Sequence, residues 1–221
     1  MVTRARSLFE QELRTLQDNV LQLGRMVEEA IAEAVEALKE RDVARAEQVI
    51  AHDEVVNRLR FDIEEQCLRL IATQQPTARD LRAIIAAVHI AVELERMGDH
   101  AAGIGVLTTR LADRPHIKPL IDVPRMARID QEMIRESLKA YVEEDAELAA
   151  QVAERDDEID HLYDQIYREL LVFMMEDPHI ITRATWLLWV GHNLERIADR
   201  VTNICERVIF MVTGELRELQ A

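Results

Sequence analysis

The chain has 221 residues, of which 48% are hydrophobic and 31% are charged, while aromatic residues make up only 4%. Its formal net charge of −15 argues against nucleic acid as a partner, because contacts to the phosphate backbone need a basic face. The same charge argues against attachment to anionic lipid. The abundant residues are Ala, Leu, Glu, Arg and Ile, most of which favour helices, so the composition predicts an all-α protein.

The N-terminal sequence lacks the apolar core and cleavage site of a signal peptide, and no apolar run approaches the roughly 20 residues that span a bilayer. The two cysteines, Cys67 and Cys205, are far apart and lack a metal-binding spacing, which indicates two buried thiols in a reducing compartment. We therefore expect a cytoplasmic protein.

A long first helix is predicted to end near Glu40, because apolar residues recur along it at alternating steps of four and three. Such a heptad seam is typical of long helices that pack side by side in a bundle. Asp42 follows the helix and can cap the next one. The seam consists of Phe9, Leu13, Leu16, Val20, Leu23, Val27, Ala30, Ala34 and Ala37.

A second helix is predicted over 43–73, ending before Pro76 because the residue that precedes a proline is pushed out of helical geometry. Thr77 and Asp80 form a variant of the capping box, which predicts that a third helix starts there and reaches about residue 112. Two prolines then fall within five residues, at Pro115 and Pro119, so this segment is the best candidate for a linker.

After the linker, three more helices are predicted at 122–143, 146–175 and 179–213. The last two are separated by a break at Asp177-Pro178. The expected architecture is six helices in two tandem three-helix bundles, with residues 1–114 forming the first and residues 120–221 the second.

The two halves repeat each other residue by residue, which indicates an internal duplication. In the third helix of each half, the segment from Leu94 to Asp99 recurs 100 positions further on as Leu194 to Asp199. Matched charges in the same register are harder to explain by a shared helical period than matched apolar residues. In the second helix, Asp42, Ala46, Val49, Asp53, Leu59 and Ile63 recur 103 positions further on as Asp145, Ala149, Val152, Asp156, Leu162 and Ile166.

Each half carries one Glu-Arg-x-x-Asp segment, with Glu95 and Asp99 in the first and Glu195 and Asp199 in the second. Residues four apart share a helix face, and at about 100° per residue both carboxylates point away from the apolar seam of their helix. Like charges at this spacing repel by roughly 0.2–0.5 kcal/mol, which a bound cation would remove. Carboxylate oxygens suit hard or borderline metal ions.

An ordinary ion pair within the helix is the alternative interpretation, because Arg96 and Arg196 each lie three residues before the aspartate. From the spacing alone, this solvated, ion-paired face is the commoner outcome. His192, three residues before Glu195, is either an extra ligand or a surface histidine, and the surface histidine is the commoner case. Tryptophans such as Trp189 usually pack in a bundle, and an exposed one would mark a partner surface.

The combination of two three-helix repeats, each with a Glu-Arg-x-x-Asp segment in its third helix, resembles the PhoU family. The segment from Gln75 to Arg82, followed by Leu94-Glu95-Arg96-Met97-Gly98-Asp99, is similar to the signature of that family. The segment from Asn193 to Arg200 is similar to it as well. The resemblance extends from about Phe9 to Met211.

This resemblance implies six helices in two pseudo-symmetric halves and, as in some members, multinuclear iron or zinc clusters held by carboxylates. By position the ligands would be Glu95, Asp99, Glu195 and Asp199, with Asp53 and Asp156 as secondary candidates. Asn57 stands where the second half has Asp160, and Gly103 where it has Asn203, so equal occupancy of the two halves is in doubt.

The resemblance also implies a negative regulator of phosphate uptake and of the phosphate-starvation response. Such a protein is an adaptor between the ATPase subunit of a phosphate ABC transporter and a phosphate-sensing histidine kinase, reaches the membrane through these partners, and forms a homodimer. No nucleophile or cofactor motif is visible in the sequence, so we expect no enzyme activity.

Two other classes of protein remain open. A carboxylate-bridged metal protein with an enzymatic or storage role would need inward-facing Glu-x-x-His pairs on two helices, as in di-iron bundles. The sequence has one such pair on a single helix, Glu158 and His161. A structural coiled-coil spacer would leave the repeated acidic segment without a purpose.

Overall fold

The structure is a computed structural model that describes residues 2–216, 218 and 219, and within these residues it contains helices and no strand. The helices follow in the order α1 (Val2–Glu40), α2 (Val43–Gln74), α3 (Ala78–Leu111), α4 (Asp122–Glu143), α5 (Ala146–Ala153), α6 (Asp156–Glu176), the short 3₁₀ helix η1 (Pro178–Ile180) and α7 (Ile181–Thr213). None of them is both long and apolar enough to cross a membrane.

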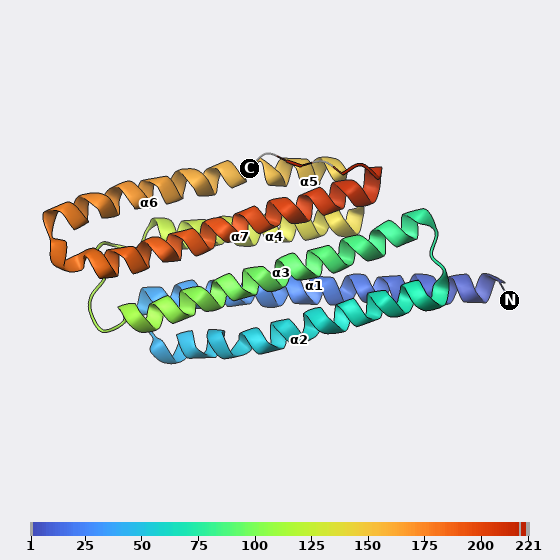
Figure 1. Cartoon of the computed structure of the whole chain (residues 1–221), viewed down its shortest axis with the longest axis horizontal. Helices are drawn as coiled ribbons and strands as arrows, with labels where there is room; N and C mark the ends of the chain where they lie inside the picture. The colour runs from blue at the N-terminus through green and yellow to red at the C-terminus, as the bar shows by residue number, and fades with distance from the viewer. Residues whose placement is uncertain (1, 217, 220–221) are drawn as a thin grey trace.

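The helices form an elongated bundle with two halves that lie side by side (Figure 1). In the first half α3 packs against α1 and α2, and in the second half α7 packs against α4, α5 and α6. The halves meet through α3 and α7 in the middle of the molecule, and through α1 and α4 behind them. One continuous apolar core therefore runs through both halves.

The duplication is visible in the burial of α1 and α4. Each buried position of α1 from Val20 to Leu38 recurs as a buried position 103 residues further on, in α4. Most of these pairs are apolar in both halves, but the fourth pair replaces valine with aspartate. The pairs are Val20 and Val123, Leu23 and Met126, Gly24 and Ala127, Val27 and Asp130, Ala30 and Met133, Ile31 and Ile134, Ala34 and Ser137, Val35 and Leu138, Ala37 and Ala140, and Leu38 and Tyr141.

Capping residues mark the starts of the second helix in each half. The Asp42 carboxylate accepts a hydrogen bond from the backbone N–H of Arg45, as predicted, and Asp145 caps α5 in the same way. Thr77 is at the N-cap of α3, but its hydroxyl donates to the Asp80 carboxylate at 2.7 Å rather than capping a backbone N–H. The two residues of the predicted box therefore bond to each other through their side chains, and the Thr77 side chain does not cap α3.

The predicted helix 146–175 is wrong in one respect, because it is interrupted at Glu154–Arg155 and forms α5 and α6. Arg155 bonds to the carboxylates of Glu132 and Glu136 on α4, which holds the turn in place. The next three residues, Asp156 to Glu158, are acidic and suit the positive end of a new helix. The first half has His52 in place of Arg155 and is also acidic at Asp53 and Glu54, yet α2 continues there without a break.

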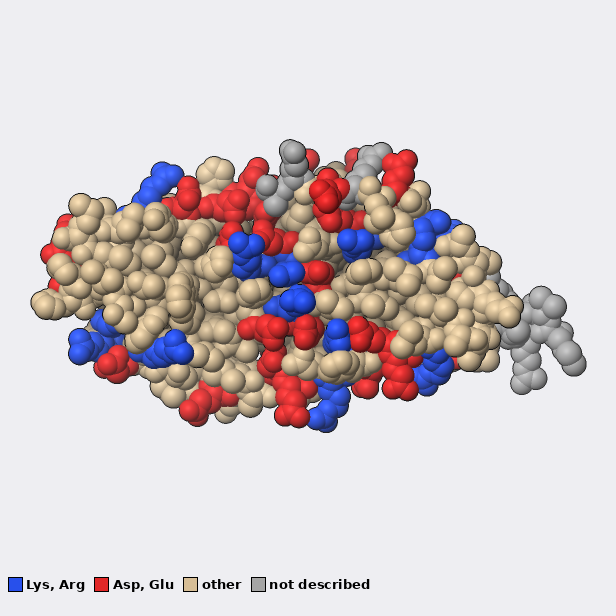
Figure 2. All heavy atoms as spheres, in the orientation of Figure 1, with Lys and Arg blue, Asp and Glu red and all other residues tan. Residues whose placement is uncertain are grey.

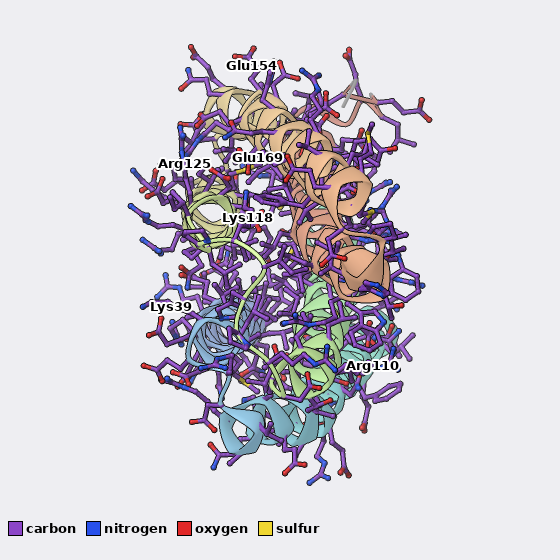
Figure 3. The ribbon with its side chains drawn as sticks, turned by 90° about the vertical axis from the view of Figure 1, so that its left-hand side faces the viewer. Lys39, Arg110, Lys118, Arg125, Glu154 and Glu169 are labelled. Carbon is purple, nitrogen blue, oxygen red and sulfur yellow. The ribbon has the colours of Figure 1, made fainter. Side chains whose placement is uncertain are left out.

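The linker between α3 and α4 is held mainly by the second half. The Lys118 side chain is largely buried and pairs with Asp122 at 3.3 Å and with Glu169 of α6, which lies next to it in Figure 3. The Arg183 guanidinium donates to the carbonyl of Pro115. The division into 1–114 and 120–221 stays a prediction about domain boundaries, and it falls within this linker.

The two cysteines are free and buried, as expected. Burial raises the pKa of the Cys67 and Cys205 thiols to about 12, so neither is a reactive thiolate at neutral pH.

We expect Gly105→Ala to destabilise the protein by about 1–3 kcal/mol, because the new methyl would lie 3.0 Å from the backbone carbonyl oxygen of Ala46 on α2. Gly103→Ala is a matched control on the same helix, since its methyl would meet the end of the Asn193 side chain rather than backbone. Urea unfolding measures both variants. A Gly105→Ala variant as stable as Gly103→Ala would contradict the close approach of α2 and α3.

Candidate functional site

The four motif carboxylates lie on the faces of α3 and α7 that point away from the apolar seam, as predicted. The seam residues are fully or almost fully buried, whereas Asp99 is exposed and Glu95, Glu195 and Asp199 are partly exposed. These faces are nevertheless flanked by α2 and α6, so the carboxylates lie beside a second helix. The seams consist of Ala87, Ile90, Leu94, Met97, Ala101 and Ile104 in α3, and of Leu187, Val190, Leu194, Ile197, Val201, Ile204, Val208 and Met211 in α7.

In the first half, Asp53 of α2 joins the motif residues Glu95 and Asp99, and we call these three the first-half cluster. Asp53 packs against Gly98, where a methyl would lie 3.3 Å from its Oδ1. Burial, followed by the charge of Asp99, raises the pKa of both Asp53 and Glu95. Asn57 donates to Asp53 Oδ2 at 3.0 Å and opposes this shift.

In the second half, Asp156 and Asp160 of α6 join Glu195 and Asp199, and these four form the second-half cluster. Burial, then the charges of Asp160, Asp199 and Glu195, raise the pKa of Asp156 to about 7. Burial and Asp199 also raise the pKa values of Asp160 and Glu195. The second half therefore concentrates more negative charge than the first, where Asn57 replaces Asp160.

The ion-pair alternative is present in the second half. Arg196 contacts Asp199 Oδ2 through Nη1 at 2.8 Å and Glu195 Oε2 through Nε at 3.3 Å. His192 Nδ1 lies 3.2 Å from the same Glu195 oxygen, so this histidine is on the carboxylate face. These contacts compensate part of the charge, and a cation would have to compete with Arg196.

Two carboxylate oxygens of the clusters, Asp53 Oδ1 and Asp156 Oδ1, are buried without a hydrogen-bond partner. Glu195 Oε2 is also buried without a hydrogen bond, but Arg196 and His192 contact it as ion-pair partners. Such atoms are costly to leave unsatisfied, and oxygen donors of this kind fit a hard or borderline cation. Within the described part of the chain, no three His, Cys, Asp or Glu side chains are arranged to hold a metal ion as they stand. Side-chain rotation would have to precede binding.

Two residues of these sites were missed by the sequence analysis. Arg60 of α2 lies close enough to Glu95 to lower its pKa and oppose the effect of burial. Asp130 of α4 is fully buried, and the charge of Asp156 acts on it. The signal for Asp130 was available, because it interrupts an apolar seam in the repeat of α1.

Hydrogen bonds between other residues of α3 and α7 connect the two helices that carry the clusters. Glu93 accepts hydrogen bonds from Arg200 at 3.2 Å and from Asn203 at 3.3 Å, and His100 bonds to Asn193 at 3.0 Å. Figure 2 shows the result as acidic side chains gathered on both sides of a central row of basic ones.

Comparison with known proteins decides the family. The family model described as the PhoU domain matches the chain twice, over residues 20–107 and 123–208. The chain belongs to the PhoU family. The acidic clusters of both halves lie within the matched segments, and the resemblance inferred from the Glu-Arg-x-x-Asp segments is confirmed.

Proteins named as PhoU homologues align with nearly the whole chain. It is 40% identical to the "Phosphate-specific transport system accessory protein PhoU homolog" of Clostridium acetobutylicum, over 97% of this chain and 98% of the relative. It is also 40% identical to the protein of that name from Aquifex aeolicus, with 93% of each chain covered.

Solved PhoU structures confirm the all-α fold. The phosphate transport system regulatory protein PhoU of Streptococcus pneumoniae superposes with a TM-score of 0.89 at 34% identity, covering 96% of this chain and 100% of that one. PhoU of Pseudomonas aeruginosa superposes with a TM-score of 0.88 at 36% identity, covering 94% and 100%.

Proposed function

We propose that this protein is a negative regulator of phosphate uptake and of the phosphate-starvation response. In this role it is a cytoplasmic adaptor that contacts the ATPase subunit of a phosphate ABC transporter and a phosphate-sensing histidine kinase. It acts by contact rather than by catalysis, and it reaches the membrane through its partners. The observation that carries the proposal is the full-length relationship to phosphate-specific transport system accessory proteins.

Exposed apolar side chains support a mechanism by protein contact. At the end of the molecule where α6, η1 and α7 meet, Val172, Met175, Ile181 and Trp189 are all about half exposed or more. Figure 2 shows a broad area without charged side chains over this end. The net charge of −15 disfavours acidic partners on the rest of the surface. We therefore place the contact with the transporter ATPase subunit on these exposed apolar side chains.

Deleting the gene should leave phosphate-starvation genes expressed in phosphate-rich medium, because the restraint on the sensor kinase is lost. A reporter fused to a starvation-induced promoter measures this, with the wild-type gene supplied in trans as the control. Full repression in a strain that lacks this gene and any second copy would contradict the regulatory role.

The double variant Val172→Asp and Met175→Asp should bind the ATPase subunit at least about 10-fold more weakly, since charges at the centre of an apolar contact are poorly tolerated. Pull-down from purified components measures the binding. Val142→Asp on α4 is a matched control, because Val142 is similarly exposed but lies outside this surface. Equal binding by the double variant would remove this surface from the interface.

We also propose that the acidic clusters bind iron or zinc through several carboxylates. Glu195, Asp199 and Asp156 would hold metal in the second half, and Glu95, Asp99 and Asp53 in the first. The unpartnered buried oxygens of Asp53 and Asp156 support this. They also favour the second candidate function, a carboxylate-bridged metal protein with an enzymatic or storage role.

Metal analysis together with the reporter assay separates the two functions. A metal-storage protein would bind many ions per chain and leave the starvation response unchanged when deleted. A regulator would bind few ions and change the response. We further propose a homodimer, which light scattering of the purified protein tests.

A further inference from the structure

Asp130 is the most deeply buried carboxylate of the described chain for which the packing offers no compensation. Its exposed fraction is 0%, and neither carboxylate oxygen has a hydrogen-bond partner. A buried polar group without a partner costs free energy, and native proteins retain few of them. Asp130 therefore calls for an explanation beyond packing.

The duplication shows that the fold itself does not need this carboxylate. The equivalent position of α1 is Val27, which is also fully buried. An apolar residue of similar size thus fills the same place in the first half, and it does so without the desolvation penalty. The second half has a carboxylate at a position where valine is compatible with the same helix packing.

The surroundings of Asp130 contain further carboxylates. The charged group that acts on it is Asp156, itself only 3% exposed and with Oδ1 unpartnered. The charges of Asp160, Asp199 and Glu195 in turn act on Asp156 and raise its pKa. Asp130 on α4 therefore interacts electrostatically with Asp156 on α6, and Asp156 with the carboxylates of α7, which packs against both α4 and α6.

We propose that Asp130 is an inner oxygen ligand of a divalent-cation site that it forms with Asp156 in the second half, so that this half binds the cation more tightly than the first. The proposal rests on the metal binding proposed above, and it adds a residue outside the Glu-Arg-x-x-Asp segments. A hard cation is the ligand that several carboxylate oxygens select. Bound there, a cation would compensate the negative charge of Asp130 and Asp156. Neither carboxylate forms an ion pair with a basic side chain in the described part of the chain.

The test uses the full-length protein with the first-half cluster disabled by Glu95→Ala and Asp99→Ala, so that one site is measured. After removal of metal with a chelator, Mn²⁺ is titrated, and free Mn²⁺ is followed by electron paramagnetic resonance. Asp130→Val, which restores the residue of the first half, should weaken binding at least about 10-fold. Asp130→Asn, which keeps the shape, should also weaken it.

Ser137→Ala is the matched control, because Ser137 is a second polar residue in the same seam. It stands opposite Ala34 in the repeat, and its hydroxyl donates to the carbonyl of Ile134. It should leave the Mn²⁺ affinity unchanged. Thermal melts supply a second readout: Asp130→Val should melt higher than its parent without metal, yet lose the rise in melting temperature that Mn²⁺ gives the parent.

The outcomes are distinguishable. If the parent binds Mn²⁺ and both Asp130 variants bind it equally well, Asp130 is no ligand, and the metal site of the motif residues stands without it. If the parent binds no Mn²⁺, both the metal site and this inference are overturned. If Asp130→Val fails to fold, the binding of Asp130→Asn decides the question.

Discussion

Replacing Glu195 and Asp199 together with alanine should abolish metal binding by the second half and leave the helical fold intact. Two carboxylates four residues apart are a weak chelate alone, so the site depends on both of them together with ligands from α6. Neither side chain fills the apolar seam of α7, whose members are buried on the opposite face. Metal content after growth with iron and zinc, and thermal melts with and without a chelator, measure the effect.

The expected loss is nearly complete for the second half, and the rise in melting temperature caused by metal should disappear with it. The metal-free variant should be as stable as the wild type or slightly more stable, because the like-charge repulsion is relieved. Asp164→Ala is a control on α6, since Asp164 is exposed and pairs with Arg168. Metal-free wild type under the same conditions would favour the ion pairs of Arg196 as the role of these carboxylates.

Most of the fold could be predicted because long amphipathic helices have a regular spacing of apolar residues and end at helix-breaking residues. The seam from Phe9 to Ala37 is buried almost throughout, and Pro76 and Pro178 follow the ends of α2 and α6. The break at Arg155 could not be predicted in this way. It depends on ion pairs with Glu132 and Glu136 on another helix, and helical period contains no information about such contacts.

The site was predictable as far as it depends on the geometry of a single helix. The four-residue spacing of Glu195 and Asp199 predicted that they share one helix face. The internal repeat matched Asp53 of the first half to Asp156 of the second. The sequence did not show that α6 covers this face closely enough to bury Asp156 to 3% exposure. Asp130 was missed because the comparison of the halves covered the second and third helices of each repeat and not the first.

The stability of the metal-free protein should depend on pH through Asp156. Burial and the charges of Asp160, Asp199 and Glu195 raise its pKa from 3.8 to about 7 in the folded state. Between about pH 4 and pH 7 the folded protein therefore holds a proton that the unfolded chain has released, so stability falls as the pH rises through this window.

Asp156→Asn removes this dependence, because the amide stays neutral at every pH. Relative to the wild type, its stabilising effect should be small near pH 4, grow as the pH rises to about 7, and reach a few kcal/mol by pH 8, since one pKa unit corresponds to about 1.4 kcal/mol. Urea unfolding with a chelator at pH 5 and pH 8 measures the difference, and Asp164→Asn on the exposed face of α6 controls for charge alone. A stabilisation by Asp156→Asn that is the same at both pH values would show that Asp156 ionises normally in the fold. The charge of Asp156 would then be compensated within the fold, and the structural reason for a cation beside it would disappear.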